Sequence, residues 1–131
     1  MGRSVESRVM PDLMKPIGPY SHYTKAGDFI SISAIAGVDP ATGDLVGDDV
    51  ESQTVQILKA INAILEEAGS DWAHLLHVNV FLTDMSLFAR MNEIYAGMLG
   101  DNRPARSVLE VRALPKAGAL LTMNATAFEK P

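Results

Sequence analysis

The stretch VESQTVQILKAINAILEEA, residues 50–68, carries the most regular pattern in the chain and decides which fold the rest can build. Its apolar residues recur at three- and four-residue spacing, so they form one stripe along an α-helix. Asp48 or Asp49 can cap the start of this helix, and Gly69 can close its end. The stripe consists of Val50, Ile57, Leu58, Ile61, Ile64 and Leu65. Such a helix needs an apolar surface to cover, which the neighbouring segments can supply as a sheet.

The segments on both sides of this helix alternate between apolar and polar residues, as half-buried strands do. In residues 29–35, Ile30 and Ile32 point one way and the intervening serines point the other way. A turn at Gly27-Asp28 would join this strand to a strand at 20–25, forming a hairpin. We also read residues 1–18 as an extended lead-in or short strand, 39–44 as a turn-rich loop, and 76–82 as a strand with Val78, Val80 and Leu82 on one face.

The second half of the chain predicts another amphipathic helix and two more strands. Thr83 or Asp84 can cap a helix that runs to Met98, and strands follow at 106–112 and 119–128. The order strand, strand, helix, strand, helix, strand, strand predicts an α+β fold, in which one mixed sheet carries both helices on one face. The stripe of the second helix consists of Leu87, Phe88, Met91, Ile94, Tyr95 and Met98.

The other face of this sheet would have no helix to cover it. An uncovered and partly apolar face indicates self-association, because a closed homo-oligomer would hide both the face and the sheet edges. From the alternation we place on this face Ser31, Ser33, Ile35, Arg106, Val108, Leu120, Asn124 and Phe128.

Length and composition limit the functions open to the chain. Its 131 residues fit one domain, residues 1–131, with 47% hydrophobic and 21% charged residues, an ordinary globular mixture. The net charge of −5 and the lack of a basic run argue against nucleic-acid binding. There is no cysteine, and the three histidines lack the spacing of a metal site. Because the sequence shows no signal peptide and no membrane-spanning run, we expect a cytoplasmic protein.

Arg106 is the residue whose chemistry stands out. Its guanidinium is always charged and is costly to bury without a partner. The residue starts a strand directly after a proline-containing loop. It can pair with Glu110 on the same strand face, lie on the surface with Arg103, or form a fork for a ligand carboxylate. The pattern alone favours the first two interpretations over the ligand site.

Several short segments, in order along nearly the whole chain, resemble the Rid (YjgF/L-PSP) family. The most specific is RPARS at 103–107, followed by EV at 110–111 and LPK at 114–116, which resembles the family signature PARS-x-x-EV-x-x-LP. The other segments are IGPYS at 17–21, DPATGD at 39–44, QT at 53–54 with EAG at 67–69, VFLTDM at 80–85, and an F-A-x-x-N-x-x-Y pattern at 88–95. One match would be weak, but this many in register identify the resemblance.

The resemblance implies a chorismate-mutase-like domain that forms a homotrimer, with a central β-barrel, the helices outside and clefts between subunits. It also implies an enamine/imine deaminase that hydrolyses small 2-imino acids, of the 2-aminoacrylate type, to 2-keto acids and ammonia without any cofactor. In that activity Arg106 would bind the substrate carboxylate bidentately and fix the imine carbon for attack by water.

Four further positions match family residues of the cleft, and each has a plainer alternative. Tyr20 would line the cleft, or it is an aromatic residue at a strand edge. Asn92 would bond across the cleft, or it lies exposed on the second helix. Ser33 would hydrogen-bond near the ligand, or it is an ordinary strand serine. Phe88 would close the pocket, or it packs in the core as its place in the helix stripe favours.

Two departures from the family pattern concern the same cleft. Ser33-Ala34-Ile35 stands where the deaminase members have Ser-Gly-Gln, so Ile35 would make the cleft less polar. Asn124 stands where the family has a glutamate that helps handle the catalytic water, and an asparagine can orient a water but cannot take its proton. The alternatives to the deaminase are therefore a non-catalytic carboxylate-binding or regulatory protein and, less favoured, a ribonuclease or translation inhibitor.

Overall fold

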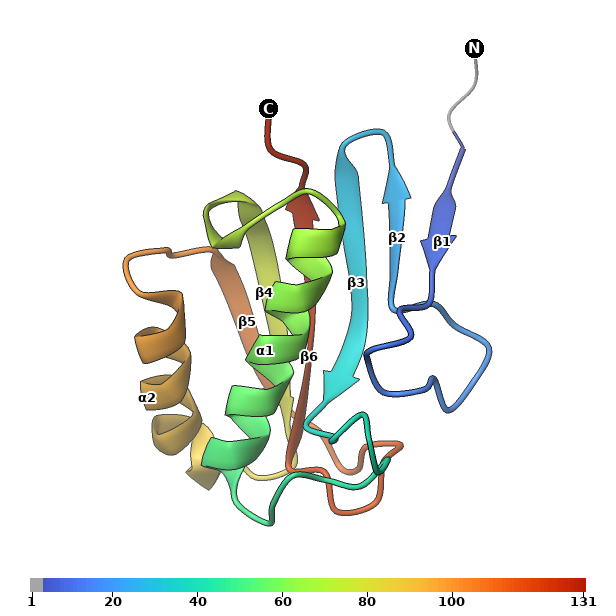
Figure 1. The fold of residues 1–131 in the computed structure, drawn as a ribbon. Helices are drawn as coiled ribbons and strands as arrows, with labels where there is room; N and C mark the ends of the chain where they lie inside the picture. Colours follow the sequence, from blue (N-terminus) through green and yellow to red (C-terminus); the bar gives the residue numbers. More distant parts are fainter. Residues whose placement is uncertain (1–3) are drawn as a thin grey trace.

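The computed structural model describes residues 4–131, which form one six-stranded mixed sheet with two α-helices on one of its faces (Figure 1). The strand order is β1-β2-β3-β6-β4-β5; β4 and β5 are parallel and the other neighbours are antiparallel. The elements are β1 (Glu6–Arg8), β2 (Tyr23–Ala26), β3 (Phe29–Ala36), α1 (Val50–Glu67), η1 (Trp72–His74), β4 (Leu75–Leu82), η2 (Met85–Leu87), α2 (Phe88–Leu99), β5 (Ala105–Glu110) and β6 (Leu121–Phe128). The predicted α+β class, with both helices on one face, is confirmed.

Helix α1 forms as its pattern predicts and supplies the centre of the core. Asp49 is the N-cap residue, and its carboxylate accepts a 2.8 Å hydrogen bond from the Ser52 N–H. Hydrogen bonds from Ser52 hold the pKa of Asp49 below its usual value. At the other end, Gly69 adopts the left-handed conformation with φ 84°, which ends the helix. Ile61 is fully buried between these two ends.

The start of α2 differs from the prediction. Asp84 caps a single 3-10 turn, η2, instead of the α-helix, and its carboxylate accepts from the Ser86 N–H at 2.9 Å. The α-helix begins only at Phe88 and extends to Leu99. Its buried line is Met91, Tyr95 and Leu99. The predicted stripe was therefore right in phase and ended one residue too early.

A β-bulge in β3 changes which side chains face the helices. Ile32 is paired with Ala125 and Ile35 with Met123, so β3 has one residue more than β6 in this interval. The extra residue puts Ile32 and Ile35 on the same face, where both are buried in the core. The prediction that Ile35 lies on the uncovered face was wrong, because strict alternation does not hold across a bulge.

Strand β5 also faces the opposite way from the prediction. Its parallel pairing sets Arg106 beside Val78 and Val108 beside Val80. Because Val78 and Val80 are buried under the helices, Arg106 and Val108 lie on the helix-covered side and not on the uncovered face. Leu120, which precedes β6, likewise packs against the core and was wrongly placed.

The uncovered face of the sheet carries a mixture of polar and exposed apolar side chains. Phe29 and Leu109 are 46% and 52% exposed, whereas Asn79 and Asn124 are paired opposite each other on β4 and β6. This mixture agrees with the predicted character of the face, although its residues differ in part. In the described part of the chain, no helix has the length and apolar character needed to cross a membrane.

Candidate functional site

Arg106 lies at the edge of the sheet, where β5 meets α2. Its Nη1 donates a 2.7 Å hydrogen bond to Oδ1 of Asn92. Its guanidinium carbon lies 4.7 Å from the centroid of the Tyr95 ring and 5.6 Å from that of Phe88. These are distances at which a cation is attracted to an aromatic face. Three residues of α2 therefore hold the guanidinium in place, and Asn92 bonds to Arg106 of its own chain. The bond of Asn92 across a cleft between subunits stays a prediction.

The half-buried guanidinium of Arg106 has no acidic partner among residues 4–131. Glu110, one partner considered from the sequence, instead accepts a 2.7 Å hydrogen bond from the Met85 N–H. By contrast, Arg8 and Arg90 form ion pairs with Glu67 and Glu51. A partly buried cation without a counterion favours binding of an anion, and a guanidinium matches a carboxylate in shape.

A cavity of about 400 Å³ adjoins this guanidinium. Arg103, at its rim, donates to the carbonyls of Gly100 and Asn102, so its side chain is bound to its own loop. The Tyr95 hydroxyl is buried and has no hydrogen-bond partner among the described residues. Burial raises the pKa of Tyr95, against the opposing effect of the two arginine charges. The cavity is lined by Asn92, Tyr95, Ala96, Leu99, Arg103, Pro104 and Arg106.

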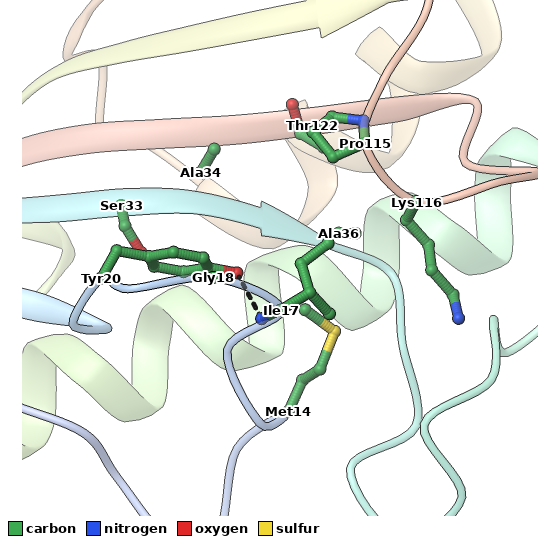
Figure 2. A pocket seen from close by; sticks show the side chains of 10 residues that line it. All are labelled: Met14, Ile17, Gly18, Tyr20, Ser33, Ala34, Ala36, Pro115, Lys116 and Thr122. Atoms are coloured by element: carbon green, nitrogen blue, oxygen red, sulfur yellow. Dashed lines mark hydrogen bonds between the residues drawn. The ribbon is translucent and has the colours of Figure 1, made fainter.

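A second cavity of about 400 Å³ lies at the ends of β3 and β6 and is closed by the loop between β1 and β2 (Figure 2). The Tyr20 hydroxyl accepts a 3.3 Å hydrogen bond from the Ile17 N–H, the dashed line in Figure 2. The Lys116 ammonium donates to the carbonyl of Gly43 at 3.0 Å. The walls are mainly apolar, and the lining residues are Met14, Ile17, Gly18, Tyr20, Ser33, Ala34, Ala36, Pro115, Lys116 and Thr122.

Asn124 lines neither of these cavities. Its Oδ1 accepts a 2.8 Å hydrogen bond from Asn79, whose own Oδ1 lies 3.1 Å from Nε2 of His77. These residues are on the uncovered face, so Asn124 and Arg106 lie on opposite faces of the sheet. The prediction that both share one face was wrong, because alternation shows which residues of β5 go together but not which set faces the helices.

The structure places five of the predicted residues in two separate groups and the other two elsewhere. Arg106, Asn92 and Phe88 come together at α2, whereas Tyr20 and Ser33 meet at the second cavity. Ile35 belongs to the core, and Asn124 to the polar network described above.

Sequence reasoning gave no site role to several residues of these cavities, among them Tyr95, Thr122 and Lys116. Tyr95 was read as part of the helix stripe and of the F-A-x-x-N-x-x-Y match, without a role at the site, although its spacing of three from Asn92 places both on one helix face. Thr122 and Lys116 were not singled out, and only the folded β6 and its preceding loop bring them to the second cavity.

The sheet order, with both helices on one face, defines a chorismate-mutase-like α+β protein, in which a cavity lies beside an arginine without an acidic partner in the described chain. The family model described as Endoribonuclease L-PSP matches residues 10–129. The chain therefore belongs to this family, which includes the Rid and YjgF proteins.

Relatives and solved structures agree with this assignment. A RutC family protein of Pyrococcus horikoshii is 46% identical over 88% of this chain and 91% of its own length. The chloroplastic Reactive Intermediate Deaminase A of Arabidopsis thaliana is 38% identical over 86% of this chain and 61% of its own. The crystal structure of E. coli TdcF with bound serine has a TM-score of 0.88 at 29% identity, covering 95% of this chain and 99% of that one.

Proposed function

We propose that the protein is an enamine/imine deaminase that hydrolyses small 2-imino acids to 2-keto acids and ammonia. The observation that carries the proposal is the guanidinium of Arg106, which is oriented by Asn92 and Tyr95 but not neutralised by an acidic side chain of residues 4–131. A relative named as a reactive intermediate deaminase supports the activity. The serine bound in the TdcF structure, itself a 2-amino acid, supports a ligand with a carboxylate beside the reacting carbon.

Arg106 is the carboxylate anchor in this proposal. One of its N–H groups is committed to Asn92, which fixes the plane of the guanidinium and leaves the remaining N–H groups for a bidentate contact. Anchoring the carboxylate sets the position of the adjacent C=N carbon. Water adds to that carbon and gives one proton to nitrogen, which forms a tetrahedral carbinolamine. Its hydroxyl then gives the second proton to nitrogen, the C–N bond breaks, and ammonia leaves as the C=O bond of the 2-keto acid forms. Positioning and electrostatics thus supply most of the catalysis.

The proposed active form is a homotrimer with its substrate clefts between subunits. Within one chain the Arg106 cavity and the Tyr20–Ser33 cavity are separate, so a second copy is needed to bring the two sets of groups together. The exposed apolar residues Phe29 and Leu109 on the uncovered sheet face support such an assembly. Light scattering at micromolar concentration should give three times the chain mass, and a monomer would contradict every intersubunit role.

The activity can be tested by trapping imines before they hydrolyse. An amino-acid oxidase generates the 2-imino acid, and semicarbazide competes with the protein for it. The wild type should reduce the yield of semicarbazone, whereas Arg106→Ala should lose about 100-fold or more of this effect, since a charged contact to the substrate is removed. Arg90→Ala is the matched control, because Arg90 is an arginine on α2 that pairs with Glu51. An inactive wild type, or an Arg106→Ala protein as active as the wild type, would refute the proposal.

A second candidate function is carboxylate binding without turnover. No Asp, Glu or His side chain of residues 4–131 lines either cavity, so neither wall offers a group that would take a proton from water. Calorimetric titration with 2-oxobutanoate separates the two functions. Binding that depends on Arg106, together with no change in the semicarbazone yield, would favour the regulatory role.

A further inference from the structure

His22 lies just before β2, is 3% exposed and has both ring nitrogens in hydrogen bonds. Its Nδ1 lies 2.8 Å from the backbone N–H of Met10, and its Nε2 lies 2.6 Å from the carbonyl oxygen of Met14. A backbone N–H can only donate, and a carbonyl can only accept. The ring therefore satisfies both contacts only when it is neutral, with its single proton on Nε2.

The backbone of His22 makes a second connection, toward the sheet. Its carbonyl accepts a 3.0 Å hydrogen bond from the N–H of Ser33 and a 3.1 Å bond from the Ser33 hydroxyl. Ser33 lies in the bulge of β3, and its hydroxyl lies beside Tyr20 in Figure 2. The ring of His22 thus holds the loop between β1 and β2, while its carbonyl holds the bulge.

These two connected segments are the main walls of one cavity. Met14, Ile17 and Tyr20 come from the loop, and Ser33 and Ala34 come from the bulge. The His22 ring bonds to Met14 itself, which is one of the lining residues. A change at the ring would therefore displace the cavity wall directly, although the ring is not part of that wall.

We infer that His22 is a positioning residue, whose neutral ring fixes the loop of residues 9–22 and so places Tyr20 opposite Ser33. A second proton on the ring would sit on Nδ1 and face the Met10 N–H, so an attractive contact would become donor against donor. The loop would then separate from the sheet, and the cavity would lose the wall that carries Tyr20. The structural part of this inference stands alone, and its effect on turnover rests on the proposed deaminase function.

Charged groups on the neighbouring elements are already engaged with one another. Glu67 on α1 accepts from Arg8 on β1 at 3.1 Å and from Tyr23 on β2 at 2.8 Å. The hydrogen bond from Arg8 is the main reason that the pKa of Glu67 lies below its usual value. Lys25 on β2 pairs with Glu129 at 3.2 Å. In the described structure no carboxylate accepts from the His22 ring, so an added proton on Nδ1 has no acceptor.

Amide exchange at Met10 tests the inference without any substrate. His22→Leu removes both ring contacts at similar size and should speed exchange of the Met10 N–H by about tenfold or more, since a buried donor loses its acceptor. His22→Gln keeps one acceptor and one donor and should restore much of the protection. His74→Gln is the matched control, because that histidine pairs with Asp71 away from the loop. Unchanged Met10 exchange in a folded His22→Leu protein would overturn the inference.

Ring ¹⁵N NMR of the wild type gives a second measurement, which stays decisive if His22→Leu does not fold. At neutral pH the His22 ring should show protonation at Nε2 alone, with Nδ1 free to accept from the Met10 N–H. Protonation at Nδ1 in the neutral protein would contradict the inference.

The semicarbazone assay then links the loop to turnover. We expect His22→Leu to raise KM about tenfold with a smaller change in kcat, because the cavity wall loosens while Arg106 is untouched. If the wild type hydrolyses no imine, the proposed function fails, whereas the Met10 measurements still decide the role of His22.

Discussion

The face of α1 that packs on the sheet and the face of α2 that packs on β5 differ in what they bury. Ile61 and its neighbours on α1 are enclosed by apolar side chains, and the polar groups at the helix start are capped. Where α2 packs on β5, the covered groups among residues 4–131 include the half-buried guanidinium of Arg106, which has no acidic partner, and the buried Tyr95 hydroxyl, which has no hydrogen bond. The packing of α1, where apolar burial and hydrogen bonding are both satisfied, serves stability. The packing of α2, which leaves a charge and a hydroxyl unsatisfied, is the kind of place where a functional site is expected.

Truncating the α1 core should give the largest effect on stability. Ile61→Ala creates a cavity at a fully buried position and should lower the free energy of unfolding by about 2–5 kcal/mol. The catalytic parameters of the protein that remains folded should not change. Urea denaturation measures the loss, with Ile94→Ala on the half-buried face of α2 as the comparison. If the two substitutions cost the same, the contrast between the helices would be lost.

Giving Arg106 of β5 an acidic partner on α2 should abolish the difference between Arg106 and the ion-paired Arg90. Asn92→Asp places a carboxylate where an amide oxygen now accepts from Arg106 at 2.7 Å. The new ion pair competes with the substrate carboxylate, so KM should rise about tenfold or more while the melting temperature is kept. Asn92→Ala is the control, since it frees the guanidinium without neutralising it. A KM unaffected by Asn92→Asp would contradict the anchor role of Arg106.

Removing the cap of α1 should have a smaller effect that depends on pH. The hydrogen bonds from Ser52 lower the pKa of Asp49 in the folded protein, so the charged form stabilises the fold. This contribution is fully present above the ordinary carboxyl pKa of about 4 and is lost as the pH falls through the lowered folded value. Asp49→Ala should therefore melt below the wild type at pH 7, by less than Ile61→Ala does. The two melting curves should converge in strong acid; a constant difference would rule out a cap that acts through its charge.

The smallest effect is expected where the hydroxyl without a partner is removed. Tyr95→Phe keeps the ring under the Arg106 guanidinium and deletes a buried oxygen that makes no hydrogen bond in the described structure. Stability should stay within about 1 kcal/mol of the wild type or increase. Urea denaturation measures this, and semicarbazone trapping should show little change. A clear loss of stability would mean that the hydroxyl has a partner in the assembled protein.

The sequence predicted the parts of the fold that depend on local periodicity. The spacing of Ile57, Ile61 and Ile64 defines the buried stripe of α1, and the alternation of Val78, Val80 and Leu82 defines that of β4. What it did not predict depends on pairing between distant segments. Strand β6 lies between β3 and β4, and β5 pairs in parallel at the edge, so the side that Arg106 faces is set only in the folded sheet.

The sequence identified some residues of the candidate site but not how these residues are arranged in space. The PARS segment and the matching helix pattern singled out Arg106 and Asn92, and the structure joins them by a hydrogen bond. Ile35 was placed on the wrong face because nothing in the residue pattern of β3 marks the bulge, and the prediction assumed strict alternation. His22 was passed over because its two partners are backbone groups, which any sequence contains.

The bulge of β3 also bears on how a protein of this kind can diverge. Because Ile32 and Ile35 both point into the core, the two residues between them are released from the packing pattern of the strand. Ser33 and Ala34 form part of a cavity wall and no part of the core cluster. An exchange at Ala34 would therefore change the wall of this cavity without repacking the interior, so the shape of the wall and the packing of the core are open to separate selection.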